Sequence, residues 1–135
     1  MARAQSAKIW SLHYRLIVSV ITGVTAEVSA LGVDPKELLL LAAVDDHPHP
    51  AELAADLCMP KPTVTAMVKR LEADGFLTRE IDPADLRRHR LSLTASGRKA
   101  TARGLAILYG AFGERLSRLG ASEQAALHAM LEKMS

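Results

Sequence analysis

Apolar residues recur every three or four positions along the first quarter of the chain. This spacing places them on one face of an α-helix, so the pattern predicts one long helix over about residues 5–31. The stripe consists of Ile9, Leu12, Leu16, Val20, Val24, Val28 and Leu31. Gly32 follows the stripe, and glycine readily adopts the left-handed conformation that ends many helices.

Capping residues mark the start of the next helix. Asp34 precedes Pro35, and Glu37 occupies the third helical position, which is the signature of a capping box with proline in the first turn. The apolar run that follows ends at the sequence DDHPHP, where the prolines prevent continuation. Pro50 begins a short third helix, and Pro60 ends it.

The period of the pattern changes after Pro60. A fourth helix comes first, because apolar residues keep helical spacing up to Gly75. Two segments with a period of two then predict a β-hairpin, joined by a turn of sequence DPADLRRHR. The helical stripe is Val64, Met67, Val68 and Leu71, and the strand faces are Leu77, Arg79 and Ile81, then Leu91 and Leu93. Two short helices followed by a hairpin predict a winged helix-turn-helix over about residues 34–94.

The remainder of the chain is again helical. Thr94 is placed to cap a long helix over residues 95–119, and Ser122 to cap a final helix. The predicted fold class is therefore mainly α (α+β), a winged helix-turn-helix within a single domain of residues 1–135. Long helices flank it, at about residues 5–31 and 95–135. One small winged unit cannot cover both apolar flanks, so we expect a homodimer in which these are dimerisation helices.

Charge is concentrated in the predicted wing region. Residues 60–103 hold ten lysines and arginines against five acidic residues, a net charge of +5. The whole chain carries only +2, so the other residues carry −3. A basic segment in an otherwise slightly acidic chain is typical of a surface that contacts nucleic-acid phosphates.

Other chemistry is poorly supported by the sequence. The chain contains no nucleophile elbow, phosphate loop or HExxH motif, so we predict no enzymatic activity and no cofactor. The turn from Asp45 to His49 could bind Zn²⁺, but a charged turn explains it equally well, and no metal is predicted. Cys58 is the single cysteine; it suits a reducing compartment, and a structural role is expected in preference to redox sensing.

The first helix also raises the question of export. The run LIVSVITGVT follows basic residues, but serine, threonine and glycine interrupt it, and it is short for a membrane span. We therefore expect a cytoplasmic protein without a membrane partner.

The order and spacing of these motifs resemble the MarR family of bacterial transcription regulators. The resemblance covers essentially the whole chain and is strongest in AELAADL, TVTAMVKRLEADGFLTR and DPADLRRHRLSLTASG. Asp85 and Arg87, followed by Leu93, Thr94 and Gly97, match the wing signature of that family. The resemblance implies a homodimer with intertwined terminal helices, recognition helices in successive major grooves of double-stranded DNA and wing arginines in the minor groove. It also implies a small-molecule site between the dimerisation and DNA-binding regions.

Candidate site residues follow from these placements. The helix face opposite the apolar stripe and the wing are the expected DNA-binding elements. The predicted DNA-binding residues are Lys61, Thr63, Thr65, Ala66, Lys69, Arg70, Arg87, Arg88 and Arg90. Two aromatic pairs, with basic side chains nearby, suggest a site for a small aromatic effector. The predicted ligand-binding residues are Trp10, His13, Tyr14, Arg15, Tyr109 and Phe112.

The predicted function is that of a DNA-binding transcriptional regulator, a repressor that binds a pseudo-palindromic operator as a homodimer and is released by an aromatic ligand. Pro60, Ala66 and Leu86 stand where many family members have serine, arginine and arginine. These three residues leave open an alternative, in which the dimer has weakened DNA affinity and acts as a protein-interaction module.

Overall fold

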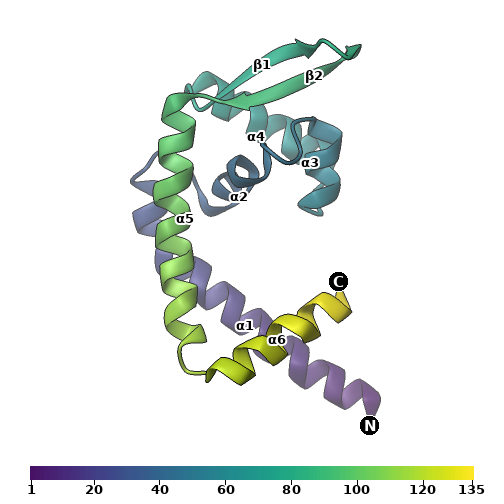
Figure 1. The fold of residues 1–135 in the computed structure, drawn as a ribbon, viewed down its shortest axis with the longest axis vertical. Coiled ribbons are helices and arrows are strands. Elements are labelled where there is room, and N and C mark those ends of the chain that lie inside the picture. Colours follow the sequence, from purple (N-terminus) through teal and green to yellow (C-terminus); the bar gives the residue numbers. More distant parts are fainter. The chain divides into compact units, whose positions relative to one another are not determined.

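The computed structural model describes residues 1–135 and contains six helices and two strands, which confirms the predicted fold class. By its internal contacts the chain divides into two compact units. We call Thr25–Ala106 the winged unit, and Met1–Val24 with Ile107–Ser135 the helical unit. The elements, drawn in Figure 1, are α1 (Ala2–Ser29), α2 (Pro35–Ala43), α3 (Pro50–Asp56), α4 (Lys61–Ala73), β1 (Leu77–Asp82), β2 (Asp85–Leu93), α5 (Ala95–Leu116) and α6 (Ala121–Met134).

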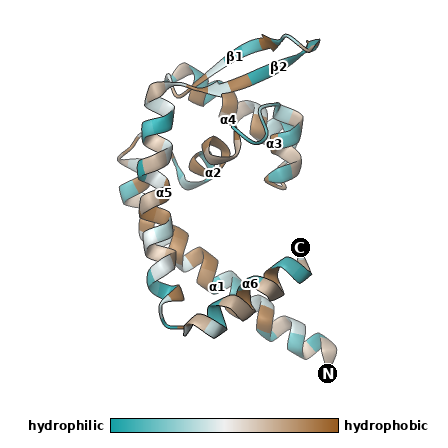
Figure 2. Ribbon diagram, in the orientation of Figure 1, coloured by the Kyte–Doolittle hydropathy of each residue, from teal (hydrophilic) through white to brown (hydrophobic).

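The core of the winged unit lies among α2, α3, α4 and the two-stranded sheet. Helix α2 is the most consistently apolar of these elements, as its brown ribbon in Figure 2 shows. The predicted stripe of α4 is confirmed, since Val64, Val68 and Leu71 are fully buried. The other large buried side chains of this core are Val33, Leu38, Leu40, Leu41, Val44, Leu53, Leu77 and Leu91.

The predicted caps of the winged unit are confirmed. Asp34 Oδ1 accepts the Glu37 N–H at 2.8 Å, and Glu37 Oε1 accepts the Asp34 N–H at 2.9 Å, which completes the capping box. Gly75 adopts φ of +82°, the left-handed conformation expected at the end of α4. Thr94 Oγ1 accepts the Gly97 N–H at 3.0 Å and so caps α5.

The wing differs from its prediction in two respects. Strands β1 and β2 are antiparallel, and β2 begins at Asp85. The predicted nine-residue turn is therefore wrong, because most of it is strand and only Pro83 and Ala84 join the strands. The pairing also shifts between Ile81 and Asp82. At this irregularity Asp82 is buried and Ile81 is exposed, so Ile81 does not share the buried face of Leu77 as predicted.

Two glycines of α5 permit close packing within the winged unit. A Cβ atom on Gly97 would lie 2.1 Å from the Phe76 carbonyl oxygen, and one on Gly104 would lie 2.5 Å from Leu38 Cδ1. Both distances are far below van der Waals contact. Glycine at these positions therefore brings α5 against the end of α4 and against α2.

The helical unit buries few of its apolar side chains within one chain. Helix α6 has no buried residue. The prediction for its start is wrong, because the helix begins at Ala121 with Gly120 as the N-cap, so Ser122 lies inside the first turn. The long helix before it also ends earlier than predicted, at Leu116. The exposed apolar set of this unit is Ile9, Trp10, Leu12, Tyr14, Ile17, Val18, Tyr109, Met130, Leu131 and Met134.

Helix α1 combines 28 residues with a window of mean hydropathy 1.2, so by length and composition alone it could cross a membrane. Only 11% of that window is buried within the chain. A helix that packs against a second copy of the protein is also long, apolar and little buried within its own chain.

Candidate nucleic-acid interface

Helix α4 presents one polar face to solvent. Its apolar stripe packs into the core, and the intervening positions are all exposed. The Thr65 hydroxyl donates to the Lys61 carbonyl at 2.9 Å, which leaves its oxygen able to accept another bond. The ammonium groups of Lys61 and Lys69 have no partner in the chain. The predicted residues on this face are Lys61, Thr63, Thr65, Ala66, Lys69 and Arg70.

Arg70 has a second set of contacts that the sequence did not indicate. Its guanidinium makes a two-point ion pair with Glu37 of α2 and donates to Asp74 at 3.0 Å. The Glu37 side chain is only 2% exposed, whereas that of Arg70 is 49% exposed. The hydrogen bond to Glu37 raises the pKa of Arg70 above its ordinary value. Arg70 therefore neutralises a buried carboxylate, and its predicted contact with DNA stays a prediction.

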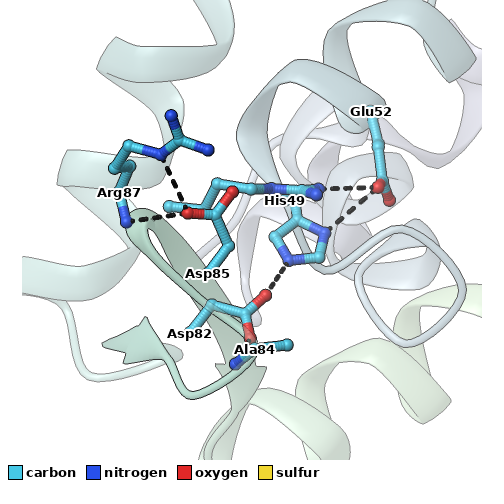
Figure 3. Close-up of polar contacts among 7 residues, drawn as sticks. His49, Glu52, Asp82, Ala84, Asp85 and Arg87 are labelled. Atoms are coloured by element: carbon cyan, nitrogen blue, oxygen red, sulfur yellow. Dashed lines mark hydrogen bonds and ion pairs between the residues drawn. The ribbon is translucent and has the colours of Figure 1, made fainter.

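The wing tip presents Arg87 to solvent in a fixed orientation. The Arg87 side chain is 91% exposed. Asp85 Oδ1 accepts both the backbone N–H of Arg87, at 3.1 Å, and its Nε–H, at 3.2 Å. Figure 3 shows the two dashed contacts. The aspartate thus orients the base of the arginine side chain, and the terminal guanidinium nitrogens remain free to bind phosphate or base edges.

The other two wing arginines have different surroundings. Arg88 donates to Glu52 of α3 at 2.9 Å, so it links β2 to the helix-turn-helix. Arg90 is exposed and lies opposite Glu80 in the strand register, without an ion pair. Strand β2 therefore carries one tethered, one bridging and one unpaired arginine.

A polar cluster between α3 and the wing was not predicted. Both ring nitrogens of His49 approach carboxylates, with Nε2 2.6 Å from Asp82 Oδ2 and Nδ1 3.1 Å from Glu52 Oε1 (Figure 3). The only sign of this cluster in the sequence is the histidine-bearing turn, which also suggests a possible Zn²⁺ site. His47 instead pairs with Asp56 at 3.3 Å, and no group of three or more His, Cys, Asp or Glu side chains is arranged to hold a metal ion.

The predicted ligand-binding residues all lie in the helical unit. Trp10 and Tyr14 stack with ring centroids 6.0 Å apart and planes at 26°, so the first aromatic pair does face one side of α1. Tyr109 is exposed and Phe112 half-buried. The Arg15 guanidinium donates to Ser11 within α1, and His13 is exposed.

A separate open hollow of about 250 Å³ lies in the winged unit. Its wall includes Leu31 and Phe76 as apolar groups and Lys99 and Arg103 as cations. The sequence did not single out these residues, because they come from three segments that only the fold brings together. Cys58 is exposed, and its thiol donates a hydrogen bond to the Ala55 carbonyl oxygen at 3.8 Å.

A helix with an exposed polar face, followed by a hairpin with an arginine at its tip, defines a winged helix-turn-helix protein. Residues 31–88 match the family model described as MarR family. In sequence and in fold, the chain is thus similar to the MarR family of winged helix-turn-helix regulators.

Known relatives agree with this assignment over nearly the whole chain. The chain is 29% identical to the HTH-type transcriptional repressor Rv2887 of Mycobacterium tuberculosis over 136 aligned positions, covering 99% of this chain and 98% of the relative. The solved complex of Rv2887 with salicylic acid matches with a TM-score of 0.72 and 29% identity, covering 92% and 93% of the two chains. The transcriptional repressor CouR bound to a 23-mer DNA duplex matches with a TM-score of 0.76 and 28% identity, covering 91% and 89%.

Proposed function

We propose that this protein is a transcriptional repressor that binds double-stranded DNA as a homodimer. The exposed face of α4 enters the major groove, and Arg87 enters the adjacent minor groove, where narrow A·T-rich segments attract arginine. Two subunits place two α4 helices in successive grooves, so the operator is pseudo-palindromic. The protein acts in the cytoplasm, where its DNA is.

The observation that carries this proposal is the presentation of Arg87. A long, flexible cation at the tip of a hairpin loses conformational entropy when it binds. The two bonds from Asp85 hold the backbone and the Nε atom before DNA arrives, which reduces that loss. The named activities of the relatives support the same function, since Rv2887 is a transcriptional repressor and CouR has been solved with DNA.

We expect Arg87→Ala to weaken operator binding by at least about tenfold, because it removes a phosphate or minor-groove contact in each subunit. With six to ten phosphates neutralised per dimer, the wild-type plot of log K against log salt should have a slope of about −5 to −9. Fluorescence anisotropy with a labelled promoter fragment at several salt concentrations measures both quantities.

Arg118→Ala is the matched control, because Arg118 is an exposed arginine of the helical unit. It should leave affinity and slope within about twofold of wild type, since the winged unit alone carries the proposed DNA-binding residues and exposed surface charges are screened by salt. Equal affinity of Arg87→Ala and wild type would show that the wing does not bind DNA as proposed.

The proposed dimer is formed by the helical unit. Its exposed apolar set includes Leu12, Trp10 and Met134, and a soluble chain rarely leaves so many large apolar side chains uncovered. An interface that covers them should bury more than about 2,000 Å², the range of obligate dimers.

A small aromatic acid is the proposed effector, with Trp10, Tyr14, Tyr109 and Phe112 as its apolar walls and His13 or Arg15 meeting its carboxylate. The structure of Rv2887 with salicylic acid supports this ligand class. We expect salicylate to change the emission of Trp10, the single tryptophan, and to weaken operator binding. Apolar walls with one ionic contact correspond to affinities of about 1 μM to 1 mM.

Titration of the emission, with operator affinity measured in parallel, tests this assignment. Unchanged emission and unchanged affinity at saturating salicylate would exclude it. A change in affinity without a change in emission would place the ligand elsewhere, with the hollow beside Lys99 and Arg103 as the first candidate.

A second function, a protein-interaction module with weak DNA affinity, is favoured by the wing tip. Leu86 is among the most exposed large apolar residues of the chain, and Ala66 on α4 is exposed without a polar group. The salt-dependent binding assay separates the two functions, because the module would bind DNA only weakly and without preference for the promoter.

A further inference from the structure

The His49 ring lies between the helix-turn-helix and the wing. His49 immediately precedes α3, Glu52 lies in the first turn of that helix, and Asp82 is the last residue of β1. The side chain of His49 is 13% exposed and that of Asp82 is 7% exposed. Each ring nitrogen faces one carboxylate oxygen (Figure 3), so this single ring joins two elements far apart in sequence.

The chemistry of imidazole restricts which protonation state satisfies these contacts. A neutral ring has one N–H donor and one lone pair, and only the imidazolium donates through both nitrogens. Between two ionised carboxylates, a neutral ring would point its lone pair at one of them. The arrangement is therefore fully bonded only when His49 carries a proton.

Both carboxylates are held in their ionised forms. The hydrogen bond from His49, and next the Ala84 N–H at 2.8 Å, lower the pKa of Asp82. Desolvation tends to raise the pKa of Glu52, but hydrogen bonds from Arg88 and His49 outweigh it and the net pKa is lowered. Each ring nitrogen therefore faces an anionic acceptor.

The cluster is directly connected to the proposed DNA-binding residues. Glu52 Oε1 also accepts from Arg88, and the Leu91 N–H of β2 donates to the Pro48 carbonyl at 2.7 Å. The charged groups that face the ring are Glu52 from α3 and Asp82 from β1. Arg88 reaches it through Glu52, and Arg90 acts on Asp82 from β2. Loss of the ring proton therefore lowers the net charge of this cluster by one unit beside the wing.

We propose that His49 is a positioning residue for the wing and that its proton makes DNA binding depend on pH. With the proton, the ring holds β1 against α3 and keeps Arg87 and Arg88 in place. Without it, one contact becomes repulsive, the wing loosens from α3, and the cluster beside the DNA-binding residues carries one positive charge less. This inference rests on the proposed function.

The direction of the pH effect follows from the charges. Histidine changes its charge between about pH 5 and 8, so wing order and DNA affinity should fall as the pH rises through that interval. The stability that Asp82 and Glu52 contribute has the opposite pH dependence to that of His49, because the pKa values of these two carboxyl groups are lowered. It is fully present above the ordinary carboxyl range and is lost only below about pH 4.

Amide hydrogen exchange on the full chain without DNA tests the positioning role alone. The reporter is the Leu91 N–H, which is bonded to the turn that carries His49. After correction for the intrinsic rate, its protection in wild type should fall about tenfold between pH 6 and pH 8. Protection that does not change with pH would overturn the proposal.

Three variants sharpen the test. Glu52→Gln removes one of the two carboxylates and lets the amide nitrogen donate to a neutral ring, so the pH dependence should disappear. Because the Glu52 side chain is 42% exposed, this variant should fold. In His49→Gln the protection of the Leu91 N–H should also be independent of pH. Its value should be close to the one that wild type shows at pH 8. His47→Gln is the matched control, since His47 lies in the same turn but pairs with one carboxylate only, and it should behave as wild type.

Operator affinity at constant ionic strength provides the second readout. Wild type and His47→Gln should weaken about tenfold from pH 6 to pH 8, and Glu52→Gln and His49→Gln by less than about twofold. A pH slope of Glu52→Gln equal to that of wild type would overturn the proposal even if His49→Gln failed to fold. If wild type bound no DNA at any pH, the proposed function would fail, and the exchange experiment would still decide the role of His49.

Discussion

Leu12→Glu should convert the dimer into a folded monomer that no longer binds its operator. The Leu12 side chain is 66% exposed in the single chain, so the change should not disturb folding of one subunit. In the dimer it would bury two unpaired carboxylates in an apolar interface. At a combined cost of about 4 kcal/mol or more, the dissociation constant of the dimer should rise at least a thousandfold.

Analytical ultracentrifugation over a concentration series measures the dimer equilibrium, and circular dichroism checks that the helices persist. Thr22→Glu, at an exposed polar position on the side of α1 that carries Lys8 and Arg15, introduces the same charge outside the stripe and should stay dimeric. A folded wild-type monomer at low micromolar concentration, or a dimeric Leu12→Glu, would contradict the proposed role of the helical unit.

Arg70→Ala should destabilise the winged unit, because it leaves the buried Glu37 carboxylate without its cation. Removal of one partner of a buried ion pair is costly. Since Arg70 is half exposed and water can partly replace it, we expect a loss of about 2–4 kcal/mol in the free energy of unfolding. Urea denaturation at pH 7 measures this loss.

Two variants separate this role from contact with DNA. Lys69→Ala removes the neighbouring exposed cation, which has no partner in the chain, and should cost less than about 0.5 kcal/mol. Glu37→Gln in the Arg70→Ala background should recover part of the stability, because the neutral amide needs no cation. If Arg70→Ala lost DNA affinity but no stability, Arg70 would act mainly on DNA and the buried pair would contribute little.

Local signals explain why much of the fold was predictable. The capping box of Asp34 and Glu37 and the cap of α5 at Thr94 involve residues three positions apart, so the bonding pattern is visible in the sequence itself. The change from helical spacing to a period of two likewise separates α4 from the hairpin. Ser122 is not the cap because the Gly120 N–H is bonded by Glu123 at 2.9 Å, and the helix begins at Ala121, two residues earlier than a cap at Ser122 would place it.

The length of the wing turn could not be predicted from the same signals. Residues 85–90 have no alternation of apolar and polar side chains, because they project into solvent on both faces of the hairpin. Asp85, His89 and Arg90 pair with β1 through the backbone, and such pairing leaves no hydrophobic pattern. Leu86 and Arg87 therefore looked like loop residues although they are part of a strand.

The sequence by itself determined the class of fold, the resemblance to a known family and the basic character of α4 and the wing, because periodicity, capping residues and charge are properties of neighbouring positions. Only the tertiary structure decided how the charged side chains are partnered. Arg70 meets Glu37, and His49 meets Asp82, each across 33 positions of the chain. Such pairs depend on which helix faces and strand ends pack together, and the shift at Ile81 that turns Asp82 inward has no local signal.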